Sequence, residues 1–129
     1  MAFEVPGHLL GTLRVASTAF STKQYHFMVA SSSEGIAITP SDSAPSMTGI
    51  MQTAPTVAGE AVTLMTDGVS KCRYDTALAV GDNYIIGASG RAASTAGAAA
   101  GALIMGKVLL TGASSAIGTV QVERLGITT

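Results

Sequence analysis

The sequence lacks an excess of charge of either sign and lacks a second cysteine. Its 129 residues carry seven Lys or Arg and eight Asp or Glu, for a net charge of −1. This balance disfavours nucleic-acid binding, because a phosphate backbone demands a basic surface. The single cysteine, Cys72, cannot close a disulfide within the chain, which favours folding in a reducing compartment such as a cytoplasm.

A long apolar segment is also missing. The longest stretch without polar groups, residues 96–106, consists mainly of Ala and Gly and falls well short of the ~20 residues needed to cross a bilayer. The first ten residues contain Glu4 and Pro6, whereas a secretory signal has a basic start followed by a clean apolar run. We therefore expect no membrane partner and no secretory signal.

What the sequence does contain is small and apolar side chains. Apolar residues make up 47% of the chain, and Ala, Gly, Ser and Thr together account for about half of it, a composition typical of neither a disordered tail nor a coiled coil. The length fits one folding unit. We expect a single domain over residues 20–129, preceded by an extended N-terminal arm over residues 1–19.

Short β-branched runs between Gly and Pro residues predict an all-β fold, mainly an antiparallel sandwich or a barrel-like domain. Alternation of apolar and polar residues is clear in 61–66, 69–74 and 120–124, as half-buried antiparallel strands require. The expected strands are Gln24–Ala30, Gly35–Thr39, Met47–Gln52, Glu60–Thr66, Val69–Tyr74, Asn83–Ile86, Leu103–Leu110 and Thr119–Arg124.

Two connections between these runs carry specific expectations. Asp67-Gly68 predicts a tight hairpin turn, since both residues tolerate positive φ. The Ala-rich segment Ala92–Ala102 predicts at most one or two turns of helix, weakened by Gly97 and Gly101, with a flexible loop as the alternative.

The segment Thr111–Gly118 is similar to the nucleotide-binding turn of short-chain dehydrogenases, where glycines bring backbone N–H groups onto a pyrophosphate. Only 11 residues follow Gly118, too few for the helix, second strand and acidic ribose ligand that such a fold needs. We interpret Thr111–Gly118 as a structural hairpin turn, and we interpret Gly87–Arg91 as a hairpin turn with a solvated arginine. Asp75 and Asp82 are expected to serve solubility and turn capping.

Groups that could catalyse a reaction or bind a metal are few. His8, His26 and Cys72 lie far apart in the sequence and have no close carboxylate partners, unlike metal ligands at their usual spacing. They also form no recognisable set of nucleophile, base and orienting group. We predict no catalytic residue, no cofactor site and no metal site.

The order of several segments resembles the small capsid cement, or head-decoration, proteins of tailed bacteriophages. Phe20–Val29 is similar to the family's opening strand, Gly49–Leu64 to its Gly–apolar–apolar–Gln stretch followed by Gly-Glu-Ala-Val, Asp67–Arg73 to its Gly-Val strand, and Val80–Ile86 to its Gly-Asp turn. The resemblance spans roughly residues 20–124. The sequence departs from the family in the Ala-rich segment and in 116–118, where the family has a charged turn.

The resemblance implies a virion structural protein, made in the host cytoplasm, that binds the outer surface of the capsid. Members of this family commonly form trimers, bind the major capsid protein and reinforce the DNA-filled head. The alternatives are a β-sandwich binding module of a fibre or adhesin and, less favoured, a small nucleotide-binding enzyme fragment based on Thr111–Gly118.

The arm is our candidate for the capsid contact, and the alternatives are an idle tail or a strand added to a neighbouring protomer of the trimer. Its apolar residues stand among Pro6, Gly7 and Gly11, so they cannot all be buried regularly by the arm itself. An extended chain can bury such anchors by adding a strand to a neighbour's sheet edge. The candidate capsid-binding residues are Phe3, Val5, Leu9, Leu10, Leu13 and Val15.

Overall fold

The computed structural model describes residues 5–16, 19–30, 36–38, 48–87, 90–98, 100–123 and 125–127. This part of the chain contains strands, turns and loops and no α-helix, so the expected all-β class is confirmed. The strands are β1 (Val5–Ala16), β2 (Phe27–Ala30), β3 (Ile36–Ile38), β4 (Thr48–Met51), β5 (Ala61–Arg73), β6 (Asn83–Ile86), β7 (Ala92–Ser94), β8 (Leu103–Ile104), β9 (Gly106–Lys107), β10 (Ile117–Val122) and β11 (Gly126–Ile127).

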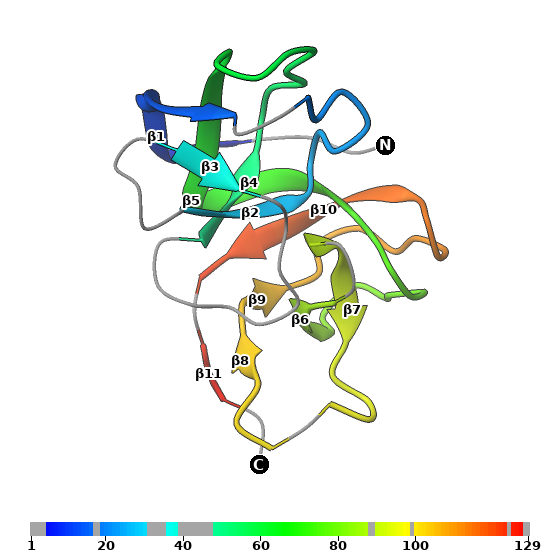
Figure 1. Ribbon diagram of the computed structural model, residues 1–129. Helices are drawn as coiled ribbons and strands as arrows, with labels where there is room; N and C mark the ends of the chain where they lie inside the picture. The colour runs from blue at the N-terminus through cyan, green and yellow to red at the C-terminus, as the bar shows by residue number, and fades with distance from the viewer. Residues whose placement is uncertain are drawn as a thin grey trace.

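Five strands close into a ring, which forms the upper part of the molecule in Figure 1. The order around the ring is β1-β3-β2-β4-β5, and β5 pairs back to β1. Four of these pairings are antiparallel, and the pairing of β1 with β3 is parallel. The barrel-like form expected from the sequence is present here, although β1 meets β3 only at Val15 and Ala16.

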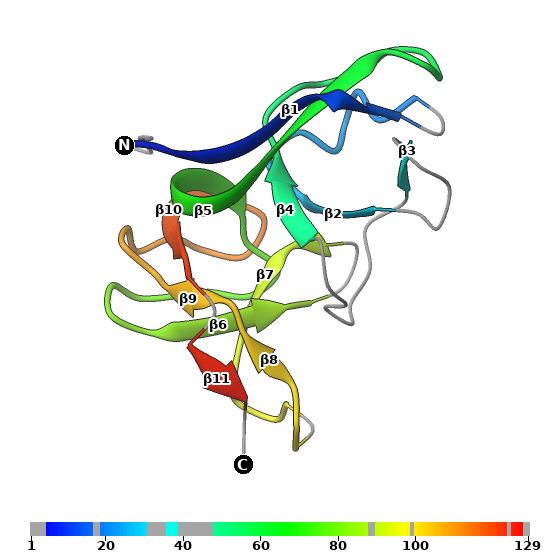
Figure 2. The ribbon, with the colours of Figure 1, turned by 90° about the vertical axis from the view of Figure 1, so that its left-hand side faces the viewer.

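β5 continues out of this ring into the rest of the fold. Its second half, from Gly68 to Arg73, pairs antiparallel with β10. β10 is linked to the β9 segment by a bridge between Val108 and Val120, and β9, β6 and β7 form an antiparallel sheet. A parallel bridge between Tyr74 and Ala92 returns from β7 to the end of β5. These pairings make a second ring, and β5 is shared by both (Figure 2).

Two hydrophobic clusters correspond to the two rings. The first comprises Phe20, Met28, Met51, Val62 and Leu64. Three residues of the second cluster, Phe27, Ile50 and Met65, are chain neighbours of residues in the first, because successive side chains on a strand point to opposite sides. The second cluster continues into the second ring and comprises Phe27, Ile50, Met65, Cys72, Tyr74, Leu78, Tyr84, Ile86, Ala92, Met105, Val108, Val120 and Val122. β2, β4 and the first half of β5 therefore each bury consecutive side chains on both faces, at 27–28, 50–51 and 64–65.

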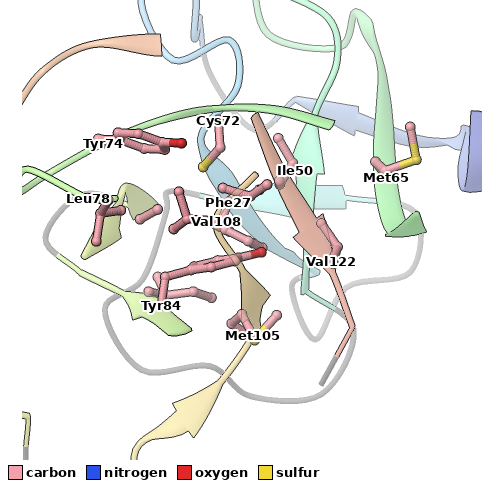
Figure 3. Packing of buried hydrophobic residues seen from close by; sticks show 13 residues of the cluster. Phe27, Ile50, Met65, Cys72, Tyr74, Leu78, Tyr84, Met105, Val108 and Val122 are labelled. Atoms are coloured by element: carbon pink, nitrogen blue, oxygen red, sulfur yellow. The ribbon is translucent and has the colours of Figure 1, made fainter. Parts of the chain in front are cut away.

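Aromatic side chains fill the centre of the second cluster (Figure 3). The rings of Phe27 and Tyr84 pack with their centroids 6.1 Å apart, within the range of favourable aromatic pairs. The Tyr84 hydroxyl donates to the carbonyl of Gln121 at 2.9 Å, so its polar end is satisfied while its ring is fully buried. This pair ties β2 to β6 and β10.

The hairpin expected at Asp67-Gly68 is wrong. β5 runs through this position without a break, and Asp67 lies opposite His8 while Gly68 lies opposite Val122. Gly68 does have a positive φ of 105°, as the sequence suggested, but this conformation bends one strand instead of reversing the chain. Figure 2 shows β5 curling at this end of the ring.

The short helix allowed for Ala92–Ala102 is not found in residues 92–98 and 100–102. Residues 92–94 form β7, whose Ala92 and Ala93 are buried beside β6. Gly97 and Gly101 adopt φ values of +76° and +88°, which are incompatible with a right-handed helix. The rest of this segment is turn and loop, as in the alternative.

Candidate functional site

The candidate capsid-binding residues, apart from one, lie on β1. Phe3 is outside the described residues. Along the strand backbone, Val5 is opposite Val69, Leu9 is opposite Met65 and Leu10 is opposite Leu64, all on β5. Val15 is opposite both Ala61 and Ile36, and Leu13 lies on the same strand. The structure thus arranges these positions in a line along one strand, and their role in capsid binding stays a prediction.

β1 leaves one of its edges largely open. On one side it pairs with β5 over most of its length, and on the other it pairs with β3 only at Val15 and Ala16. From Val5 to Arg14 this second edge has no strand partner in the described part of the chain. Such an edge can accept an added strand, although Pro6 has no backbone N–H to donate.

Register shifts explain why the sequence showed no strand period in β1. Shifts occur between Val5 and His8, between His8 and Leu9, and between Leu10 and Arg14. Each irregularity changes which side chains share a face. The segment is extended, as expected, but its backbone is paired within the chain's own sheet. The division of the chain at residue 19 stays a prediction.

A second surface combines cations with an aromatic ring, and we call it the Tyr25 surface. It consists of Tyr25, Lys71, Arg73, Ser115 and Ile117. The Lys71 ammonium lies 5.5 Å from the centre of the Tyr25 ring, a cation–π distance. The Arg73 guanidinium donates to the Ser115 carbonyl at 2.8 Å, and Arg73 is opposite Ile117 in the β5–β10 pairing.

Strand alternation places the two cations of this surface on one side of β5. Ser70 and Cys72 are buried, whereas Lys71 and Arg73 are partly exposed. The backbone also joins β5 to the turn before β2, because the Arg73 N–H donates to the Tyr25 carbonyl at 3.1 Å. The sequence showed the alternation in 69–74, but the contact with Tyr25 depends on the coiling of β5.

The acidic residue that follows β5, Asp75, is already paired. Asp75 accepts from Arg91 at 2.6 Å, and both side chains are about three-quarters buried. Arg91 is the last residue of the Gly87–Arg91 turn. The antiparallel pairing of Ile86 with Ala92 confirms that this segment is a hairpin turn. The expectation of a solvated Arg91 and a merely solubilising Asp75 is wrong, because the pair links the end of β5 to the β6–β7 hairpin. Asp82 does cap a turn, accepting from the Ala79 N–H at 3.0 Å.

The glycine-rich segment Thr111–Gly118 folds around a tyrosine ring. It is the turn of a hairpin in which Leu109 donates to the Thr119 carbonyl, so the hairpin interpretation is confirmed. A Cβ built on Gly112 would lie 2.9 Å from Tyr74 Cε2, and one built on Gly118 would overlap Tyr74 Oη. The two glycines therefore make room for Tyr74, whose hydroxyl donates to the Leu110 carbonyl at 2.6 Å. Strand β10, and not a helix, begins at Ile117.

The potential nucleophile, Cys72, and the potential base, His26, are both buried. Burial raises the pKa of the Cys72 thiol to about 12, so the group stays protonated and is a poor nucleophile. The His26 side chain is buried at 3% exposure. Within the described ranges no group of three or more His, Cys, Asp or Glu side chains could hold a metal ion. These ranges also contain no helix long and apolar enough to cross a membrane.

The fold, but not the sequence, matches known proteins. No family model and no curated protein matches this sequence. A solved structure, the crystal structure of the head fiber gp8.5 N base in bacteriophage phi29, is similar with a TM-score of 0.67, covering 95% of this chain and 100% of that chain. The two sequences are 14% identical, so the similarity is one of fold.

Proposed function

We propose that this chain is a non-enzymatic structural protein of a tailed-phage virion, attached to the outer surface of the head and cementing neighbouring capsid subunits. The observation that supports this proposal most is the fold similarity to the phi29 head fiber base over nearly the whole of both chains. The order of sequence segments that resembles the cement proteins also supports the proposal. This support is independent of the fold similarity, because it lies in the amino-acid sequence.

The architecture suits a protein under mechanical load. Two closed rings share β5, so pulling on one part of the chain strains backbone hydrogen bonds in both. The core of the second ring is filled by large side chains that are fully buried. A cement protein must be rigid, because a bound protein that deforms easily would not resist deformation of the shell.

We further propose that the partner in the shell is the major capsid protein and that the chain acts as a homotrimer. The resemblance to the cement family supports the trimer. Sedimentation equilibrium of the purified protein at micromolar concentration should give three times the 12.9 kDa chain mass. A monomer at the same concentration contradicts the trimer and leaves attachment to the head open to its own test.

Attachment is tested with heads assembled from the same phage genome but lacking this chain. The purified protein should co-sediment with expanded heads and saturate at a fixed number of copies per shell. Protein that remains in the supernatant at every concentration contradicts the proposed function. Unexpanded shells provide the matched control, because the cement family binds the expanded form.

A second candidate function is the base of a head fibre. It is favoured by one specific observation, namely that the matched structure is itself the base of a head fiber. The two functions differ in their effect on the shell. A cement should raise the temperature at which heads release DNA, whereas a fibre base should bind without changing it.

A further inference from the structure

We propose that the Tyr25 surface is the part of the molecule that docks on the head, and that it binds an acidic patch of a shell subunit through at least two carboxylates. This inference rests on the proposed function and names the contact that attachment requires. Its basis is the joint position of two cations, one aromatic ring and an exposed apolar side chain on neighbouring segments.

The two cations are available to a partner. Neither Lys71 nor Arg73 forms an ion pair with any residue in the described ranges. Asp75, two residues beyond the end of β5, is held by Arg91. The acidic residue on β5 itself, Asp67, lies opposite His8 of β1. In the part of the chain that the structure describes, no acidic side chain is paired with either cation. A surface of opposite charge would complement them.

The spacing of the cations fits a pair of carboxylates. Lys71 and Arg73 are two residues apart on one strand face, so their Cα atoms are separated by about 6.6 Å along β5. The bond from Arg73 to the Ser115 carbonyl uses one of five guanidinium N–H donors. It orients the group while leaving donors for a bidentate carboxylate contact, the strongest form of this ion pair.

The remaining residues supply the apolar part of an interface. Tyr25 is partly buried against the hydrophobic core, and the Lys71 ammonium lies over the Tyr25 ring. The ring is therefore held in place before binding. Ile117 is 39% exposed beside Arg73. Aromatic and arginine side chains held rigidly among apolar neighbours are the typical centre of a protein interface.

The test uses full-length protein and the expanded heads described above, at a series of salt concentrations. Replacing Lys71→Glu together with Arg73→Glu should weaken head binding at least tenfold and remove most of its salt dependence. Lys107→Glu is the matched control, because Lys107 is an exposed lysine on β9 and should leave binding within twofold. Circular dichroism and a thermal melt establish that each variant is folded.

A zero-length carbodiimide cross-link provides a second readout that does not depend on charge reversal. This reagent activates a carboxyl group, and a lysine amine that touches it displaces the reagent as a urea and forms an amide bond. Mass spectrometry should find Lys71 joined to an Asp or Glu of the shell. Lys71→Arg should keep head binding and lose this cross-link.

Each outcome bears on a different claim. If the unaltered protein does not bind heads, the proposed function fails. If it binds but the double variant binds equally well, or if the cross-links avoid Lys71, the function stands and the Tyr25 surface is not the docking site. Tighter binding to a 30-base-pair duplex DNA than to heads would also overturn the inference, since the surface would then recognise a polyanion.

Discussion

At the scale of single residues, Tyr74 fits closely between two glycines. The ring of Tyr74 is fully buried, and a Cβ at either Gly112 or Gly118 would press on it. Glycine is needed at positions 112 and 118 to leave space for the Tyr74 ring, and not to bind a phosphate group. A glycine-rich sequence that looks like a nucleotide-binding turn can therefore arise from the packing of one aromatic side chain.

Gly118→Ala should lower the free energy of unfolding by at least about 2 kcal/mol, because an added methyl group in a full core forces neighbours to move. Urea denaturation measures the loss. Ser114→Ala is the control: it removes only the exposed bond from the Ser114 hydroxyl to the Asp75 carbonyl and should cost less than about 1 kcal/mol. Equal losses in the two variants would mean that Gly118 is not sterically constrained.

Cys72 should make the protein sensitive to alkaline pH. In the unfolded chain a thiol ionises near pH 8.5, whereas burial raises the pKa of Cys72 to about 12 in the folded state. Between these values the unfolded state holds fewer protons, so stability falls as pH rises. For Cys72 alone the loss between pH 8 and pH 10 is about 2 kcal/mol.

The measurement is the free energy of unfolding at both pH values under reducing conditions. Cys72→Ala should be less stable at pH 8, but its decrease between pH 8 and pH 10 should be smaller by about that amount. Tyr74, whose pKa burial also raises to about 12, leaves a residual decrease above pH 10. An identical decrease in the variant and the unaltered protein would contradict the origin assigned to Cys72.

At the scale of secondary-structure elements, β5 is the strand on which the fold depends. It pairs with β1, β4 and β10, and its coil brings Ser70 within 2.9 Å of the Gln52 side-chain amide. That amide also donates to the Ile50 carbonyl at 3.0 Å. The polar contact fixes the bend from its inner side, where Ser70 has no access to water.

Gly68 should be the residue that permits this bend. With φ at 105°, an L-alanine at position 68 is strained, and Gly68→Ala should lower the free energy of unfolding by about 1–3 kcal/mol. A D-alanine placed there by peptide ligation adds the same methyl group but favours positive φ, so it should cost less. Equal costs for the two alanines would show that space, and not backbone conformation, is limiting.

The sequence predicted most elements whose apolar pattern reflects simple burial. β2, β3, β4 and β6 fall within predicted runs, and β10 begins two residues before the predicted run that it overlaps. β6 shows the period of two expected of a half-buried strand. β1 was not found, since its register shifts remove that period, and β7 was not found because alanine is a weak strand former. Gly68 was recognised as a positive-φ position, but local sequence does not distinguish a bend from a hairpin.

The Tyr25 surface was only half visible in the sequence. The alternation around Lys71 and Arg73 was clear from the pattern of 69–74. Their contacts with Tyr25 and Ser115 join segments that are distant in the chain, so they follow from the coil of β5. The candidate residues on the N-terminal segment have apolar character in common, and those from Val5 onward lie on β1, which pairs with β5. Their role in capsid binding stays a prediction.

At the scale of the whole molecule, the two rings are mechanically joined by one strand and one core. Phe27, Ile50 and Met65 come from strands of the first ring but belong to the cluster that fills the second. The rings therefore share buried surface as well as β5. We expect them to unfold in a single cooperative transition, in which calorimetric and van't Hoff enthalpies agree.

β1 is the strand whose removal tests this architecture, because it closes the first ring by pairing with β5 from Val5 to Val15 and with β3 at its end. Deleting residues 1–16 leaves backbone groups on both neighbours without partners. We expect the truncated protein to lose about 3 kcal/mol of stability and to melt roughly 10 °C lower. A synthetic peptide of residues 1–19 added in excess should restore the midpoint by occupying the vacated edge, while a peptide of the same composition in scrambled order should not. If truncation leaves the melting temperature unchanged, β1 is not needed to close the ring and the N-terminal segment is free to reach a neighbouring subunit.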